Sequence, residues 1–242
     1  LVAFALINPN FWSPTNRTNL LRQIAPILII GIAQSYVLIT GNIDLSIGSV
    51  VGMSTMVAAT LMSKGIMSPI PALLVTLLCC LLIGVLNGLL VAKFKLPPFI
   101  ATLGTMTVAR GIAQLVKGNY NTDSIMKFYP EAAQTFKNVF YYGKTLGLYN
   151  GIWIAIILWI VFNFLLSKTR TGRYIYATGS NIDAARLSGV NVVSTTVIAY
   201  VVSAFCSFVV GIITCATVGQ GTMDAGNSYE MYALSLIHIS EP

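Results

Sequence analysis

Charged residues are scarce in this chain. Only 9% of its 242 residues are Asp, Glu, Lys or Arg, whereas 56% are hydrophobic. Soluble domains carry roughly a quarter charged residues, so the chain has too few charges to cover a surface in water. Residues 23–43, 45–63, 65–92, 145–167 and 187–223 contain no Asp, Glu, Lys, Arg or His at all. Because a bilayer-spanning helix needs about 20 mainly apolar residues, this scarcity predicts a polytopic membrane protein.

Side chains that catalysis and metal binding require are also few. The chain has one histidine, His238, and its four cysteines all lie within apolar runs, at positions 79, 80, 206 and 215. Buried apolar cysteines usually act as small hydrophobes. Gly143-Lys144-Thr145 lacks the glycine five residues earlier that a phosphate-binding loop requires, since Asn138 stands there. The sequence therefore predicts no catalytic residues, no metal site and no cofactor, and hence not an enzyme.

The apolar runs predict an all-α transmembrane bundle with about six complete spans. We place these spans at residues 24–40, 45–63, 70–92, 99–116, 151–166 and 193–218. Residues 1–7 are the expected tail of a partial first span, and residues 8–23 a polar connection. A long aromatic-rich connection covers 117–150, and a basic loop covers 167–191. Residues 234–242 match the translation of a common sequencing adaptor. We therefore expect a non-native tail there, with a genuine tail as the alternative.

The net charge of +7 comes from Lys and Arg residues that sit mostly in short connections. Such positions are typical of juxtamembrane loops, and the chain has no basic stripe with interleaved aromatics for nucleic acid. The turn and loop densest in these charges should share the cytoplasmic side, which leaves the long connection outside. They carry Lys93, Lys95, Lys168, Arg170, Arg173 and Arg186.

A broken-helix motif separates the first two complete spans. It comprises Gly41, Asn42, Asp44, Ser46 and Gly48. Irregular backbone at membrane depth is tolerated where it is buried in protein or lines a watery cavity, and an ionisable residue there suggests a functional role. Alternatively, Asp44 caps the next helix with the help of Ser46. Direct contact with a solute and a capping or pivot role both remain open.

A short amphipathic helix is expected within the basic loop. Asn181 can cap it and Gly189 would end it, while Asp183 near its start and Arg186 near its end suit the helix dipole. A helix of this kind that projects from a bundle is either a docking element or an ordinary connection.

Several polar side chains lie inside the predicted spans. Thr107, Arg110 and Gln114 share one helix face. Arg110 could line a pathway for hydroxyl-rich solutes, or it could snorkel or make a structural hydrogen bond. Gln34 and Asn87 are further pathway candidates that interhelical hydrogen bonds would explain equally well. The pairs Gly48/Gly52 and Gly84/Gly88 should allow close helix approach.

Three segments in order resemble the permeases of ribose/galactose-type bacterial ABC importers. They are Asn42-Ile-Asp-Leu-Ser-Ile-Gly-Ser, Leu96-Pro-Pro-Phe-Ile-Ala-Thr-Leu-Gly-Thr-Met and the stretch from Gly172 to Val190. Asn42 stands where the family has glycine, so a tight-turn role at this position is in doubt. The resemblance implies that residues 1–233 are a permease domain, incomplete at both ends.

The resemblance also implies a mechanism. Such a permease lies in the bacterial inner membrane and imports a monosaccharide with a second permease copy or paralogue, separate ATPase subunits and an external sugar-binding protein. The ATPase-coupling loop would comprise Gly172, Arg173, Tyr176, Gly179, Asn181, Asp183, Ala184, Ala185, Arg186, Leu187 and Gly189. The alternative is a secondary transporter or channel driven by an ion gradient, for which matching broken helices in internal repeats would be expected. The sequence does not indicate which sugar is carried.

Overall fold

The computed structural model of the chain describes residues 12–118 and 120–238. The predicted partial span at 1–7 and the last residues of the predicted tail lie outside this range. Within it, five helices are long and apolar enough to cross a membrane: α2 (Pro14–Ile39), α4 (Pro69–Ala92), α5 (Pro98–Lys117), α7 (Asn150–Lys168) and α10 (Val192–Val218). A sixth apolar helix, α3 (Ile47–Ser63), has 17 residues. These six helices are the six complete spans predicted from the sequence.

Shorter elements complete the described chain. The connection between α5 and α7 contains α6 (Pro130–Lys137), a π-helical turn η2 (Asn138–Tyr142) and a hairpin of β1 (Lys144–Thr145) with β2 (Leu148–Tyr149). Between α7 and α10 lie α8 (Arg170–Ser180) and α9 (Ile182–Leu187), and α11 (Tyr229–His238) follows α10. The protein is all-α apart from the two-residue strands.

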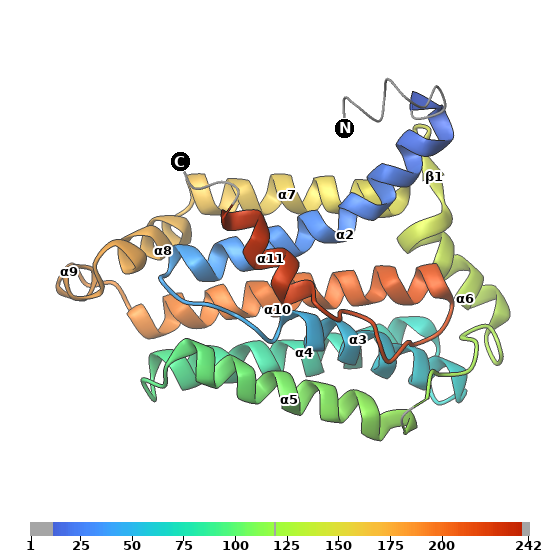
Figure 1. The fold of residues 1–242 in the computed structure, drawn as a ribbon, viewed down its shortest axis with the longest axis horizontal. Helices are drawn as coiled ribbons and strands as arrows, with labels where there is room; N and C mark the ends of the chain where they lie inside the picture. Colours follow the sequence, from blue (N-terminus) through green and yellow to red (C-terminus); the bar gives the residue numbers. More distant parts are fainter. Residues whose placement is uncertain (1–11, 119, 239–242) are drawn as a thin grey trace.

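Helix α3 is the centre of the bundle. Sixteen of its 17 residues are buried, as expected of a helix that is apolar on every side. It packs against α4, α5 and α10, while α2 and α7 lie on the other side of α10 (Figure 1). Helix α3 therefore makes almost no contact with lipid.

The polar connection predicted at residues 8–23 is wrong from Pro14 onward, because α2 begins there. The Ser13 side chain accepts a hydrogen bond from the Asn16 amide at 3.3 Å, and proline suits the first helical position. Two turns later the Arg22 guanidinium lies 3.6 Å from the Tyr149 ring centroid. A polar helix end is thus held by an aromatic residue that is distant in sequence.

The basic loop predicted at 167–191 is also wrong in part, because it contains α8 as well as the expected short helix. The Thr169 side chain caps α8 by accepting a hydrogen bond from the Gly172 amide at 3.3 Å. Ile175 and Thr178 are buried on its inner face. Helix α8 is therefore an amphipathic helix held against the ends of the spans, where its polar composition suggested a loop.

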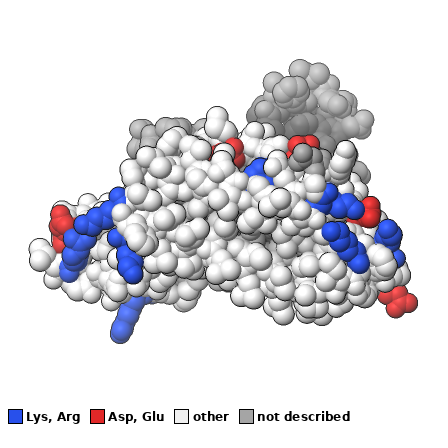
Figure 2. Space-filling model, turned by 90° about the horizontal axis from the view of Figure 1, so that it is seen from below, with Lys and Arg blue, Asp and Glu red and all other residues white. Residues whose placement is uncertain are grey.

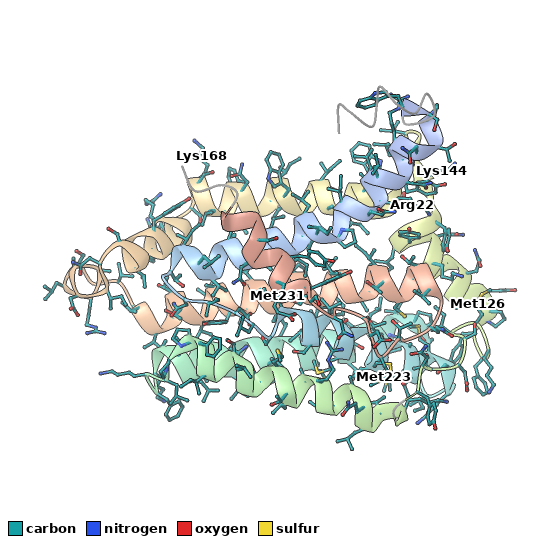
Figure 3. The ribbon with its side chains drawn as sticks, viewed as in Figure 1. Arg22, Met126, Lys144, Lys168, Met223 and Met231 are labelled. Atoms are coloured by element: carbon teal, nitrogen blue, oxygen red, sulfur yellow. The ribbon has the colours of Figure 1, made fainter. Side chains whose placement is uncertain are left out.

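Lys and Arg side chains gather at the two ends of the long axis, with a largely uncharged band between them (Figure 2). Figure 3 shows Lys168 toward one end and Lys144 toward the other. The turn between α4 and α5 lies at the same end as α8 and α9 (Figure 1). The predicted division of the basic residues into two sides is therefore confirmed, and the assignment of the α9 end to the cytoplasm stays a prediction.

The opposite end carries a small charge cluster. Lys117 and Lys127 each lie 3.4 Å from the Asp123 carboxylate. The hydrogen bond from Lys117, followed by the charges of both lysines, holds the pKa of Asp123 below its usual value. Because the cluster is exposed, it contributes little to stability.

Close helix approach is confirmed at Gly84 and Gly88. A Cβ added to Gly84 would lie 2.7 Å from the Ala204 Cβ, and one added to Gly88 would lie 2.5 Å from the Val197 Cα. Both contacts are made with α10. Gly48 and Gly52 instead face the backbone that follows α10, at Gly226 and Ala225. Glycine is thus required where α4 meets α10.

We predict that Gly84→Ala destabilises the protein by about 1–3 kcal/mol, because the added methyl overpacks the contact with α10. The matched control is Gly104→Ala on α5, where an added Cβ would meet nothing within 4 Å. That change should be neutral or stabilise by up to about 1 kcal/mol through helix propensity. Thermal unfolding in detergent micelles measures both, and equal shifts in the two variants would contradict the packing argument.

Candidate functional site

The broken-helix motif is built around a buried carboxylate. Gly41, with φ of +76°, turns the chain after α2. Asp44 is only 3% exposed. Its Oδ1 accepts hydrogen bonds from the Ser46 amide at 2.9 Å and the Ser46 hydroxyl at 2.6 Å, and its Oδ2 accepts one from the Ser203 hydroxyl at 2.7 Å. The carboxylate thus bonds to Ser46 and to α10, but Ser46 itself is the N-cap residue of α3 and its side chain makes no capping hydrogen bond. The prediction that Asp44 caps α3 is therefore wrong, and the sequence did not suggest the bond to α10.

Further hydrogen bonds extend from Ser46 to two more helices. The Asn87 amide of α4 donates to the Ser46 Oγ at 2.9 Å, and the Thr105 hydroxyl of α5 donates to the Asn87 Oδ1 at 2.6 Å. We call this chain of five buried residues, from Ser203 through Asp44, Ser46 and Asn87 to Thr105, the Asp44 network. Asn87 thus makes the interhelical hydrogen bonds that were one of its two interpretations.

The Asp44 network lies at membrane depth. Asn87 is five residues from the end of α4, and Ser203 is eleven residues from the start of α10. At about 1.5 Å of rise per residue, these positions are roughly 8–16 Å inside the end of the bundle that carries α9. Asn42 stays local and donates to the Thr40 Oγ1 at 2.8 Å. The side chains of Asp44, Ser46 and Asn42 are therefore hydrogen-bonded inside the bundle.

Helix α9 projects from one end of the molecule (Figure 1). The Asn181 Oδ1 accepts a hydrogen bond from the Ala184 amide at 2.9 Å, and Gly189 adopts a φ of +81° beyond the last turn. Ala185 is 3% exposed, whereas Leu187 is 90% exposed. The short capped helix expected from the sequence is confirmed, and it displays a leucine to solvent.

Helix α8 connects α9 to the helix break. A Cβ on Gly179 would clash with the Ile39 carbonyl and approach Thr40, at the end of α2. A Cβ on Gly172 would clash with the Leu166 carbonyl of α7. The side chains of Arg173 and Tyr176 point outward and are exposed. At these two glycines the backbone of α8 therefore lies directly against the backbones of α2 and α7. The contact with α2 is beside the start of the broken-helix motif.

The polar face of α5 borders a cavity of about 330 Å³. The Arg110 Nη1 donates hydrogen bonds to the Met223 carbonyl at 3.0 Å and the Ala225 carbonyl at 3.2 Å. The lining residues are Ser49, Met106, Thr107, Arg110, Gly111, Gln114, Asn227 and Glu230. Three of them, Thr107, Arg110 and Gln114, were pathway candidates. Asn227 and Glu230 follow α10, and nothing in the sequence singled them out.

Gln34 belongs neither to the Asp44 network nor to the cavity lining beside α5. It is fully buried, and neither its amide nitrogen nor its oxygen has a hydrogen-bond partner among the described residues. It is not among the residues that line the cavity beside α5.

Comparison with known proteins gives these features a context. Residues 16–239 match the family described as "Branched-chain amino acid transport system / permease component". The chain is similar to the ribose import permease protein of Haemophilus influenzae, with 38% identity over 96% of this chain and 71% of that protein. The corresponding protein of Bacillus subtilis is 32% identical over 98% of this chain and 71% of that protein.

The galactofuranose transporter permease protein of Escherichia coli is 33% identical over 99% of this chain and 70% of that protein. No solved structure matches. The similarity to sugar permeases extends over nearly the whole chain and includes the helix break, α9 and the polar face of α5. The chain therefore belongs to the family of bacterial ABC sugar-importer permeases, which are multi-pass proteins of the plasma membrane.

Proposed function

We propose that this chain forms, with a second copy of itself or a paralogue, the membrane pathway of an ATP-driven importer for a monosaccharide. The observation that carries the proposal is the connection from the exposed helix α9, through α8, to the break beside α2. The energy for transport would come from separate ATPase subunits. The names of the relatives mention ribose, galactofuranose, D-allose and galactose, which supports the monosaccharide class.

The ATPase would bind at α9. Leu187 and Ile182 are 90% and 47% exposed, on a helix that lies beyond the lipid-facing part of the bundle. Exposed apolar side chains on a small projecting helix fit a pocket in a partner protein. Ala185 anchors the helix instead, so a charged residue there would disturb folding and would not report on docking.

Movement of α9 would reach the solute pathway over a short distance. Helix α8 abuts Ile39 and Thr40 with no side chain between the two backbones. The broken-helix motif begins at the next residue and ends in the Asp44 network, which joins α10, α4 and α5. Packed helices of this kind move as stiff units, so a shift of α9 would displace several spans together.

The opposite end would receive the external sugar-binding protein. It carries α6, η2 and the hairpin, and its hydrogen bonds include one from the Trp153 indole to the Thr145 carbonyl at 2.8 Å. This compact surface lies outside the uncharged band in Figure 2. The two partners would therefore act on opposite ends of the long axis.

We predict that Leu187→Asp abolishes co-purification of the ATPase, because the change places a charge in an apolar contact. The matched control for co-purification is Leu146→Asp, at a residue that is 87% exposed at the other end of the molecule. It is not a control for uptake, because Leu146 lies in the hairpin that would face the sugar-binding protein. The φ of +52° at Leu146 is one that Asp tolerates. The loss should exceed about 2 kcal/mol of binding free energy, the level of an interface hot spot.

Affinity purification from detergent-solubilised membranes, with ATP-driven sugar uptake in parallel, measures the effect. The coupling role is excluded if Leu187→Asp retains the ATPase and full uptake. If sugar accumulates in vesicles under a proton or sodium gradient without any ATPase, the ion-driven alternative is correct.

We also predict that Asp44→Ala destabilises the bundle. Ser203 and both Ser46 donors would lose their acceptor, at roughly 1–3 kcal/mol for each buried group left unpaired. Asp44→Asn should cost less, because it keeps one oxygen for the Ser46 donors. Thermal unfolding with the exposed Glu131→Ala as control measures this, and an unchanged midpoint in Asp44→Ala would refute the role of the network.

A further inference from the structure

Helix α5 has a second face that no described element covers. Gly104, Thr107, Gly111 and Gln114 follow at spacings of three and four residues, so they lie along one side of the helix. A Cβ added to Gly104 or Gly111 would meet nothing within 4 Å, in contrast to the filled contacts at Gly84 and Gly88. A polar face of this kind is unfavourable against hydrocarbon. It therefore borders water or protein within the membrane.

The cavity beside this face has a second wall made of the segment after α10. Arg110 holds that segment through its Nη1 at the Met223 and Ala225 carbonyls, and Figure 3 shows Met223 between α10 and α5. The same segment also contacts α3, at Gly48 and Gly52, which have no side chains and so let its backbone approach closely. The cavity therefore has a fixed shape and does not arise from a loose loop.

The position and size of the cavity suit a small solute in transit. Arg110 is twelve residues from the start of α5 and seven from its end, so it lies roughly 10–18 Å from either end of the helix. The volume of about 330 Å³ falls at the low end of the ~300–1,000 Å³ typical of ligand pockets.

The lining side chains offer both donors and acceptors with no net charge. Arg110 supplies donors and Glu230 supplies acceptors. Both line the cavity, but among the described residues they are not in ion-pair contact with each other. A hydroxyl group can accept from the first and donate to the second. Gln114 and Asn227 can each do both, whereas the Thr107 hydroxyl donates to the Gly104 carbonyl at 2.7 Å and is left to accept.

We infer that this cavity is a binding subsite for a neutral, polyhydroxylated solute of monosaccharide size, held between α5 and the segment around Glu230. The inference rests on the proposed function and specifies the place within it where the sugar is contacted. The balanced pair of charges favours a neutral solute over an anion or a cation. Among the described residues that line the cavity, only Met106 has a large apolar side chain that could contact the side chain of a branched-chain amino acid.

Cysteine accessibility in membrane vesicles tests the inference. Among the native cysteines Cys79 alone is partly exposed, so Cys79→Ser gives a quiet background. Thr107→Cys and Gln114→Cys should react with a charged, membrane-impermeant methanethiosulfonate, because the thiolate forms only in contact with water. The matched control is Leu82→Cys. Leu82 lies in the middle of α4 and is 67% exposed, on a face that should contact lipid and stay unreactive.

The ligand class follows from protection. D-ribose, D-galactose or D-allose, at about ten times its dissociation constant, should slow labelling of Gln114→Cys about tenfold. L-leucine should not. Adding Glu230→Gln should leave labelling without sugar intact and raise the sugar concentration that gives half-maximal protection about tenfold to hundredfold, as expected for a lost hydrogen bond to a charged group.

Each contrary outcome has one meaning. Equal labelling at positions 114 and 82, or none at 107 and 114, overturns the aqueous face. Labelling that none of the three sugars slows overturns the sugar subsite, and protection by L-leucine alone assigns the cavity to amino acids. ATP-driven uptake of labelled sugar, measured in the same cells, separates these failures from failure of the proposed function, which predicts uptake in every case.

Discussion

The structure depends on the burial of one carboxylate. Asp44 lies where a charged group is costly unless hydrogen bonds replace its water shell, and three donors within 2.9 Å do so. The helix break also frees backbone groups, and here too the bundle supplies partners: the Tyr200 hydroxyl donates to the Ile43 carbonyl at 3.0 Å. Ser46 belongs to the break itself, but the Ser203 and Tyr200 donors come from α10, so the break is completed only when α10 packs against it. The irregular segment is thus a product of tertiary packing.

The spans could be predicted from hydropathy because the lipid environment imposes helical structure on long apolar segments, whatever their tertiary contacts. Every backbone polar group in hydrocarbon needs an internal partner, so a long apolar run must be helical. The first turns of α2 and the whole of α8 are polar, and this constraint does not act on them. Local caps at Ser13 and Thr169 start these two helices. Partners distant in sequence hold them against the bundle, namely Tyr149 over Arg22 and the backbone of Ile39 against Gly179. A single sequence contains no local sign of such partners.

The sequence predicted only those residues of the candidate site whose polarity is unusual in an apolar chain. Asp44 and Arg110 stand out because they are polar in an apolar background. Ser203 does not, because hydroxyl groups in transmembrane helices usually bond to their own backbone. The Ser207 hydroxyl donates to the Ser203 carbonyl at 2.9 Å in this way, whereas the Ser203 hydroxyl crosses to Asp44. Which serine reaches across is decided by helix rotation, and the sequence does not specify it.

The proposed coupling path and the proposed sugar subsite meet on α5. Thr105 ends the Asp44 network, and Arg110 lines the cavity five residues later, roughly 8 Å along the same helix. A displacement of α8 that moves the break would therefore be carried to the subsite through about one and a half turns of α5. The network lies between the cavity and the end that carries α9. If both proposals hold, one rigid unit would both transmit the stroke and close the inner side of the pathway, so the two events would be inseparable.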